Sequence, residues 1–438
     1  MSQTTTFNPS ESCNERNSAR TPVVLVVAPN DFLYRGYCLE SVAAAYDTVV
    51  ITPRPITWER GLVIDYETAD PYDRQALLAA GDLLASRHRV AAVLTWNETL
   101  LVATAHLAQH LGVLTDDPQV LHACRDKANS RAQFARHAVP SAQSIKVASL
   151  LESALAAESI GYPVVLKPSG QAGSVGVIRV DQAEQLPAAH EFATAGANLH
   201  GGDSNDVLVE EYLDGPEISV ECVTHQGQTT AVAITRKELG FEPYFEETGH
   251  SVDAADPLLA EAGPIATAAV AALGVTTVIS HVELRLTATG PRIIEVNQRI
   301  GGDLIGRLVQ LATGIDLPRA AADLALGITP DLTPTRWQAA AVRLLYPEVS
   351  GTVIERGIDA DLDGADWLTQ VSWISEVGDQ VVLPPEGDVD VARVGLVVVT
   401  AADAGQAAAR IEEAQAHITV VVHPAPENGT VSGGQVAE

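Results

Sequence analysis

Apolar runs alternate with stretches of helical spacing over the first quarter of the chain. Each apolar run is long enough for a buried strand, and each intervening stretch places its apolar residues on one helical face. Strands that alternate with helices predict a parallel sheet with a βαβαβα order. The expected strands are 23–28, 47–52 and 89–95, and the expected helices are 39–45, 74–85 and 98–111.

Two loops follow strands of this predicted sheet, at 29–35 and 96–98. Ligands of parallel sheets bind beyond the carboxyl ends of the strands, which makes Trp96 and Asn97 candidates for a substrate pocket. The alternative is that Asn97 and Glu98 start the following helix, because polar side chains satisfy the free N–H groups there. Both interpretations stay open.

A charged hairpin is predicted from 280 to 299, with its turn in Thr-Ala-Thr-Gly-Pro. Alternate residues of a strand share a face, so Glu283 would pair across the hairpin with Glu295, their Cβ atoms roughly 5 Å apart. Two carboxylates this close need a cation between them, and Mg2+ prefers oxygen ligands such as these and the side chain of Asn297. Arg299 would lie on the same face. The alternative is a hairpin with one solvated, charged face.

A short apolar strand ends at Lys167 and leads into a loop of small residues. Glycines let backbone N–H groups approach phosphate oxygens, and the lysine adds a positive charge. The pattern is neither a Walker A loop nor a Rossmann fingerprint, because no Gly-Lys-Ser/Thr follows and 177–180 has strand character. We expect a mobile β-hairpin over phosphates, with an ordinary surface hairpin as the alternative. The loop residues expected at the phosphates are Ser169, Gly170, Gly173, Ser174, Gly176 and Val177.

Two further segments suit a nucleotide. A helical, basic stretch at 121–138 contains Lys127 and is one of few basic clusters in an acidic chain, which favours anion binding. A strand from 207 runs into Glu-Glu-Tyr-Leu, turns at 214–216 and returns with Glu217 on one face. Backbone groups of such a connector can pair with an adenine edge, and Glu217 can bind ribose hydroxyls. The alternative is again a solvated hairpin face.

The order of these motifs resembles the ATP-grasp superfamily over roughly residues 115–325. The resemblance implies that Lys127 and Lys167 contact ATP phosphates beneath the glycine loop. It also implies that Glu217 holds the ribose and that Arg299 meets the reacting carboxylate. The residues it places at the adenine are Glu210, Glu211, Tyr212 and Leu213. The residues it places at one or two Mg2+ ions, with Mn2+ as an alternative metal, are Glu283, Glu295 and Asn297.

Within the superfamily, the chain is similar to the L-amino acid ligases, which join amino acids. The similarity rests on Arg299-Ile-Gly-Gly-Asp303 and on the segment 244–251, where His250 is expected in a substrate loop. It implies catalytic roles for Arg299 and His250, and substrate contacts for Gly301 and Gly302. The implied reaction activates a carboxylate with ATP as an acyl phosphate and joins it to the amine of a second amino acid. The product would be a dipeptide or a γ-glutamyl-type amide.

Two alternatives to this function stay open. Biotin carboxylases share the overall plan, so the chain could be a bicarbonate-activating carboxylase. The Met-Lys-Met signature of a biotin carrier is absent, because the only methionine is Met1. The second alternative is a nucleotide-binding protein that has lost its chemistry. The joint presence of the carboxylate pair, Asn297 and Arg299 disfavours it.

The amino-acid composition of the chain limits which partners it can bind. The formal net charge of −29 argues against binding nucleic acid, whose phosphates attract clustered lysine and arginine. No apolar run reaches membrane-spanning length, and the four cysteines lack metal-ligand and Cys-x-x-Cys spacing. We therefore expect a cytoplasmic protein with two small-molecule substrates and no membrane partner. A homodimer is left open.

With 438 residues and 46% hydrophobic content, the chain is expected to form about three α/β domains. These are an N-terminal parallel-sheet (pre-ATP-grasp) domain, a central ATP-grasp α+β domain with a lid subdomain, and a C-terminal α/β lobe. The expected boundaries are 21–114, 115–329 with the lid at 141–215, and 330–425, with a disordered tail at 1–20 and a mobile tail at 426–438.

Overall fold

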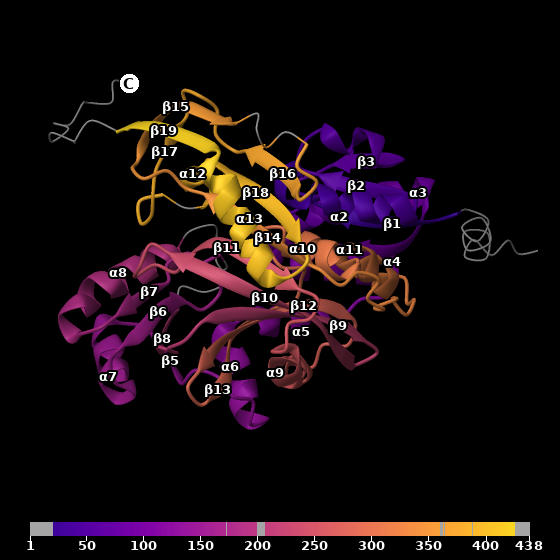
Figure 1. Cartoon of the computed structure of the whole chain (residues 1–438). Helices are drawn as coiled ribbons and strands as arrows, with labels where there is room; N and C mark the ends of the chain where they lie inside the picture. Colours follow the sequence, from indigo (N-terminus) through magenta and orange to yellow (C-terminus); the bar gives the residue numbers. More distant parts are fainter. Residues whose placement is uncertain are drawn as a thin grey trace, which may run out of the picture.

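The computed structural model describes residues 21–171, 173–198, 206–359, 362, 364–387 and 389–424. The tails predicted at 1–20 and 426–438 lie outside these residues. Within the described part, the strands form four sheets, and the N-terminal sheet lies beside the central one (Figure 1). The mixed α/β class predicted from the sequence is confirmed.

The N-terminal sheet has the strand order β3-β2-β1-β4, and all its pairs are parallel. Its apolar strands are buried, as the continuous runs of valine and isoleucine predict. Helix α2 begins at Phe32 and is capped by Asp31, so the loop predicted at 29–35 is largely helical. Strand β3 was not predicted. The elements are β1 Pro22–Val27, α2 Phe32–Ala45, β2 Thr48–Thr52, β3 Asp65–Thr68, α3 Arg74–Arg87, β4 Arg89–Leu94, η2 Glu98–Leu100 and α4 Leu101–Leu111.

The basic stretch predicted as one helix at 121–138 forms two helices. These are α5, Pro118–Arg125, and α6, Lys127–Arg136. Asp126 separates them, because its extended backbone ends the first helix and its side chain accepts a hydrogen bond from the N–H of Ala128. This break places Lys127 at the first turn of α6.

A four-stranded antiparallel sheet of order β5-β8-β6-β7 carries helices α7 and α8. Strands β6 and β7 pair as the predicted hairpin, and the glycine loop connects them. At Gly176, a Cβ atom would lie 3.0 Å from the Cα of Gly196 in α8, so the loop needs a glycine there to pack on the helix. The elements are β5 Ser144–Val147, α7 Leu150–Ile160, β6 Val164–Pro168, β7 Ile178–Val180, α8 Leu186–Ala197 and β8 Val207–Glu211.

The central sheet has eight strands in the order β13-β12-β9-β10-β11-β14-β18-β16. The predicted return of the chain from β8 into β9 as one hairpin is wrong, because the two strands belong to different sheets. The turn at 214–216 therefore connects the four-stranded sheet to the central sheet. The elements are β9 Glu217–His225, β10 Gln228–Gly240, β11 Glu246–Asp253, α9 Leu259–Leu273, β12 Val278–Thr287, β13 Gly290–Asn297, α10 Ile305–Thr313 and α11 Leu317–Ala325.

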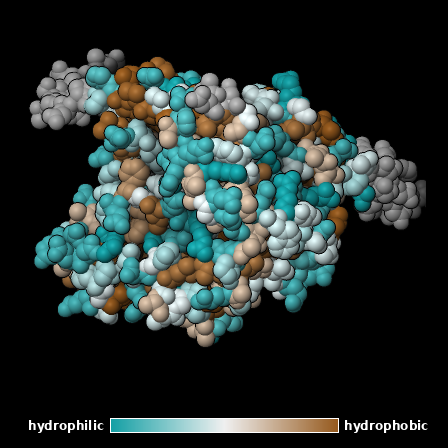
Figure 2. All heavy atoms as spheres, viewed as in Figure 1, coloured by the Kyte–Doolittle hydropathy of each residue, from teal (hydrophilic) through white to brown (hydrophobic). Residues whose placement is uncertain are grey.

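The C-terminal part continues the central sheet through β14, β18 and β16, which helix α13 covers (Figure 1). Strands β17, β15 and β19 form a separate small sheet. Brown side chains gather over this small sheet in Figure 2, where Ile354 and Val421 are exposed. The elements are β14 Ala339–Leu345, β15 Gly351–Ile358, β16 Leu368–Trp373, β17 Gln380–Val381, α12 Val389–Ala392, β18 Gly395–Ala401, α13 Ala404–Ala416 and β19 Ile418–Pro424.

The largest apolar core joins the N-terminal sheet to the central sheet, and it includes Val26, Trp96 and Leu308. This shared core also contains Ile279 of β12 and Ile300, which follows β13, so it packs the N-terminal sheet close to that hairpin. Among the residues that the structure describes, none of the helices combines the length and apolar character needed to span a bilayer.

Candidate active site

A cavity of about 240 Å3 lies between the sheet β5-β8-β6-β7 and the central sheet, and Val389 and Arg393 of the C-terminal part also line it. Most residues singled out in the sequence line it, although they come from segments far apart in the chain. The predicted residues in its lining are Lys127, Lys167, Gly173, Ser174, Val177, Glu210, Glu211, Tyr212, Leu213, Glu217, Glu283, Glu295, Asn297, Arg299 and Gly302. The predicted residues outside it are Trp96, Asn97, Ser169, Gly170, Gly176, His250 and Gly301.

One end of the cavity is positively charged. Lys127, Arg131 and Lys167 reach it from α6 and β6. The carboxylate of Glu210 lies between two of them, 2.6 Å from Lys167 Nζ and 2.8 Å from Arg131 Nε. Ser169 lies behind this group, where its hydroxyl donates to Asp126 at 2.6 Å. Two cations pair with Glu210 alone, and the third, Lys127, pairs with Glu295, which leaves a surplus of positive charge that suits an anionic ligand.

Burial shifts the pKa values of Lys167 and Glu210 in opposite directions. Burial lowers the pKa of Lys167 and outweighs the attraction of Glu210. Burial alone would raise the pKa of Glu210, but Arg131 and Lys167 outweigh it and lower that pKa to about 2. Glu210 is therefore ionised at neutral pH, and its side chain holds the two cations in place.

Replacing Glu210 with Gln should lower the free energy of unfolding at pH 7 by about 3 kcal/mol, from the difference between its folded pKa and that of an unfolded glutamate. Because the folded pKa is depressed, this stability is present above the unfolded pKa and is lost as pH falls toward about 2. Denaturant unfolding between pH 7 and pH 2 measures it. Glu211→Gln is the matched control, since the half-buried pair of Glu211 with Arg292 should contribute less.

The opposite wall is aromatic and cationic. The Tyr212 ring stacks against Phe245 with centroids 6.3 Å apart, and Arg179 lies 4.2 Å from the Tyr212 centroid. Leu213 is buried beside them. Such a wall can stack against a planar, apolar ring system such as a purine. Glu217 lies next to this wall and pairs with Arg285 at 3.0 Å.

The predicted pairing of Glu283 with Glu295 across β12 and β13 is confirmed. Lys237 Nζ lies 2.7 Å from Glu283, and Lys127 Nζ lies 3.0 Å from Glu295. Asn297 is buried beside this pair. The carboxylates and the amide are hard oxygen donors on one face of the hairpin, so the donor set fits Mg2+ or Mn2+. The two ammonium groups already compensate part of the negative charge there.

His281 lies between two carboxylates, with Nδ1 2.8 Å from Glu221 and Nε2 3.1 Å from Glu283. Burial would lower the pKa of His281, but Glu221 outweighs it and raises that pKa to about 9. Burial alone would raise the pKa of Glu283, but Lys237 and His281 hold it well below its ordinary value. The Glu283 carboxylate is therefore ionised and held in one orientation.

Arg299 follows the end of β13, so the predicted unbroken strand through Arg299 is wrong. Its Nε lies 3.1 Å from Glu98 Oε2, and its Nη1 donates to the carbonyl of Ile300. Asn97 caps the short helix η2 and thereby orients Glu98. Trp96 is buried, with Nε1 donating to the carbonyl of Pro29. In this loop Glu98 is therefore the residue that contacts the lining of the cavity, whereas Trp96 and Asn97 support it.

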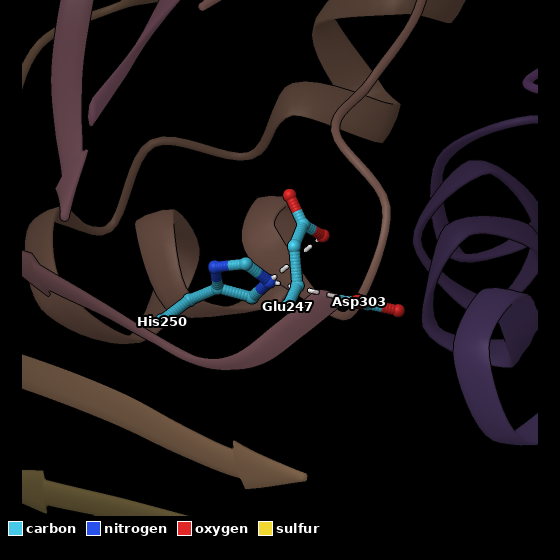
Figure 3. Close-up of side chains that lie close together, drawn as sticks. All are labelled: Glu247, His250 and Asp303. Atoms are coloured by element: carbon cyan, nitrogen blue, oxygen red, sulfur yellow. Dashed lines mark ion pairs between the residues drawn. The ribbon is translucent and has the colours of Figure 1, made fainter. Parts of the chain in front are cut away.

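At the other end of the cavity lie Glu247 and Asp303, and His250, which is outside the lining, lies close to both carboxylates (Figure 3). His250 is on strand β11, so its predicted position in a loop is wrong. Figure 3 shows its ring directed at both carboxylates, with Nε2 3.4 Å from Glu247 and 3.6 Å from Asp303. Burial lowers the pKa of His250, but the attraction of Glu247 and the contact with Asp303 outweigh it and raise that pKa.

The three side chains could hold a metal ion by their spacing, since their ligand atoms lie within 4.8 Å of one another. Two cations already pair with the carboxylates, however. Lys237 Nζ lies 2.5 Å from Glu247, and Arg393 lies 2.7 Å from Asp303. A divalent ion here would have to displace or tolerate these cations, so this group suits a ligand that hydrogen-bonds to the carboxylates better than a metal.

Gly301 and Gly302 connect this end to Arg299. A Cβ atom at Gly301 would lie 2.9 Å from His281 Nδ1, so only glycine lets the loop approach the histidine this closely. At Gly302 a Cβ would meet nothing within 4 Å, and the residue lines the cavity.

Several residues of the cavity were not predicted from the sequence. They are Arg131, Phe245, Glu247, Arg285 and Arg393 in the lining, and Lys237, which pairs with Glu247 and Glu283 of the lining. Arg393 carried a usable signal, because it interrupts the apolar run Val-Ala-Arg-Val-Gly-Leu, and a charged residue in such a run indicates a buried ion pair. Lys237 carried none of this kind, because it lies in the polar sequence Thr-Arg-Lys-Glu.

Comparison with known proteins agrees with this geometry. Residues 160–307 match the family profile of the ATP-grasp domain. The fold matches that of an L-amino acid ligase from Bacillus licheniformis with a TM-score of 0.78 and 20% identity, covering 92% of this chain and 99% of that one. Residues 160–307 therefore match an ATP-grasp domain, and the likeness to the solved structure concerns the fold.

Several relatives align with more than half of the chain, among them two with named activities. Human carnosine synthase 1 is 30% identical over 264 residues, which are 56% of this chain and 31% of that protein. The alanine–anticapsin ligase of Bacillus subtilis is 27% identical over 277 residues, 57% of either protein. The matched stretch is thus less than two thirds of each relative's length.

Proposed function

We propose that this protein is an ATP-dependent carboxylate–amine ligase that joins two amino acids. The observation that carries the proposal is the sharing of one cavity by a cationic end, a carboxylate pair and Arg299. The cationic end can bind the phosphates of a phosphate donor, the carboxylate pair can bind a metal, and Arg299 can bind a carboxylate substrate. The reaction needs these three features side by side. The likeness to an L-amino acid ligase and the two relatives support the same class.

In the proposed first step, a substrate carboxylate attacks the γ-phosphate of ATP and forms an acyl phosphate and ADP. Lys127, Arg131 and Lys167 bind the phosphates, and the aromatic wall of Tyr212 and Phe245 holds the adenine. A bound Mg2+, held by Glu283, Glu295 and Asn297, would neutralise charge on the phosphate oxygens.

In the proposed second step, the amine of another amino acid attacks the acyl carbon and phosphate leaves. Arg299 lies beside the carboxylate pair and can bind the substrate carboxylate with two N–H groups. The same guanidinium can stabilise the oxyanion of the tetrahedral intermediate, a contribution of about 3–4 kcal/mol for one such donor. The carboxylates of Glu247 and Asp303, which flank His250 at the other end of the cavity, can accept hydrogen bonds from the amino group of an amino acid.

A screen of ADP release over pairs of amino acids, with products identified by mass spectrometry, tests this function. We expect ADP release that needs both amino acids and a product mass equal to their sum minus water. ADP release that needs bicarbonate instead would assign the protein to the carboxylase class. ATP binding without turnover under any pair, or with bicarbonate, would favour a non-catalytic nucleotide-binding protein.

Replacing Lys167 with Met should weaken ATP binding by about ten- to a hundredfold, because a charge-assisted contact to phosphate is lost. Calorimetric titration with a non-hydrolysable ATP analogue measures the change. Lys146→Met is the matched control, since this lysine of the same sheet pairs with Asp206 and is absent from the lining of the cavity. Equal analogue affinity in Lys167→Met and the parent would remove Lys167 from the phosphate site.

A further inference from the structure

The loop between Arg299 and α10 is held by two arginines from distant parts of the chain. Arg35, in α2, donates from Nη1 to the carbonyl of Gly301 at 2.9 Å, and this contact is buried. Arg393, just before β18, donates from Nη1 and Nη2 to the two oxygens of Asp303 at 2.7 and 2.9 Å. Helix α2 of the N-terminal part and the segment before β18 of the C-terminal part therefore both fix the position of this short loop.

The backbone of the loop is strained where Arg393 holds it. Asp303 and Leu304 have φ angles of 45° and 64°, in the left-handed region that side-chain-bearing residues rarely adopt. Such conformations persist only where the surroundings fix them, and they concentrate at ligand sites. Arg393 supplies such a constraint, because both of its terminal nitrogens bind the Asp303 carboxylate in one plane.

We propose that Arg393 is a positioning residue for the amino-acid end of the cavity. This inference rests on the proposed function. The Arg393 guanidinium also donates from Nε to the hydroxyl of Tyr346 at 2.9 Å and from Nη2 to the carbonyl of Glu247 at 3.4 Å. One side chain thus connects Asp303 to the backbone of Glu247, the two residues whose carboxylates flank His250.

The chemistry of this position needs an arginine. Arg393 is 2% exposed, and its five N–H donors lie in one plane, so it can bind a carboxylate, a hydroxyl and a carbonyl at once. A lysine would keep the charge but would hold a single point of contact. Burial would raise the pKa of Asp303, but Arg393 and His250 keep it well below its ordinary value. Arg393 therefore keeps Asp303 both ionised and in place.

The test compares Arg393→Lys and Arg393→Met with a matched control, Arg319→Lys. Arg319 also pairs with an aspartate, Asp323 in α11, but it is absent from the lining of the cavity. We expect kcat/KM for the amino-acid substrates to fall on the order of a hundredfold in both Arg393 variants, the effect of misplacing a positioned group by about 1 Å. The KM for ATP should stay at the parent value. Arg319→Lys should match the parent in both constants.

A second measurement does not depend on activity. Hydrogen exchange of the ligand-free protein, followed in peptides that cover 300–308, reports on the loop itself. We expect at least about tenfold faster exchange in the Arg393 variants, with the peptides of β6 and β8 unchanged. Tyr346→Phe removes the hydroxyl partner of Nε, together with the bond from that hydroxyl to the carbonyl of Glu247, but leaves the Arg393–Asp303 pair. It should give a smaller increase, which keeps the test informative if Arg393→Met folds poorly.

The outcomes separate the two proposals. If the parent releases no ADP with any pair of amino acids, the proposed function fails, and the exchange measurement alone decides the role of Arg393. Unchanged loop exchange in Arg393→Lys and Arg393→Met would overturn the positioning role. An equal rise in KM for ATP and for amino acids, together with a lower Tm, would also overturn it, because that pattern indicates general structural support.

Discussion

Replacing Glu295 with Gln should lower the turnover number for ADP release by about a thousandfold, the equivalent of the several kcal/mol that a bound metal ion contributes. Glutamine keeps the size and one oxygen of the side chain, but it removes the negative charge of Glu295, which lies opposite Glu283 in the hairpin. Steady-state ADP release at increasing Mg2+ concentrations measures the effect. The Tm should remain close to that of the parent, because the hairpin register is set by backbone hydrogen bonds and apolar packing.

Glu238→Gln is the matched control for this prediction. Glu238 is also a strand glutamate in an ion pair, with Arg343 at 2.7 Å, but it is half exposed and outside the lining of the cavity. Surface pairs of this kind contribute little, so its activity should equal that of the parent. Parent-like turnover and Mg2+ dependence in Glu295→Gln would remove the carboxylate pair from the mechanism.

The hairpin of β12 and β13 was predictable because strand alternation and a short polar turn specify which residues pair. Glu283 and Glu295 do pair, although the structure contains a bulge between Glu283 and Leu284 and a tighter turn at Thr287 and Gly290 than expected. The bulge and the tighter turn compensate each other in the register. The parallel N-terminal sheet was also predictable, because its buried strands are continuous apolar runs separated by stretches of helical spacing.

Other features depended on contacts that local patterns do not encode. The polar segment Glu-Glu-Thr-Gly-His-Ser resembles a loop, yet it forms β11 because β10 and β14 pair with it on both sides. That pairing places His250 directly opposite Lys237. Likewise, the sequence around 207–222 resembles one hairpin, but its two strands extend two different sheets.

The role of the C-terminal part is the clearest case of long-range information. Its sequence carries no catalytic motif. The structure shows that β14 and β18 continue the central sheet and that Arg393 reaches the cavity. The partner of Arg393 is Asp303, ninety residues earlier in the chain. A local pattern could identify Arg393 as a buried charge but not name its partner.

Replacing Arg299 with Lys should lower kcat/KM for ligation by about a hundred- to a thousandfold while leaving the affinity for ATP unchanged. Lysine keeps the positive charge but loses the planar pair of donors that can bind a carboxylate and, later, an oxyanion. Ligation rates, calorimetric titration with an ATP analogue and thermal unfolding on the same variant measure the three consequences separately.

The Arg299–Glu98 ion pair at 3.1 Å offers a purely structural explanation for a loss of ligation in Arg299→Lys. The same measurements on a Glu98 variant can test this explanation. If Arg299 only anchors the loop that carries Glu98, then Glu98→Gln and Arg299→Lys should lower the Tm and the ligation rate by similar amounts. If Arg299 acts on the substrate, Glu98→Gln should retain most of the activity, because the guanidinium remains beside the carboxylate pair. Arg343→Lys, in the exposed pair with Glu238, controls for the loss of an arginine as such. Equal losses in Glu98→Gln and Arg299→Lys would therefore assign Arg299 to the scaffold and leave the oxyanion to other donors.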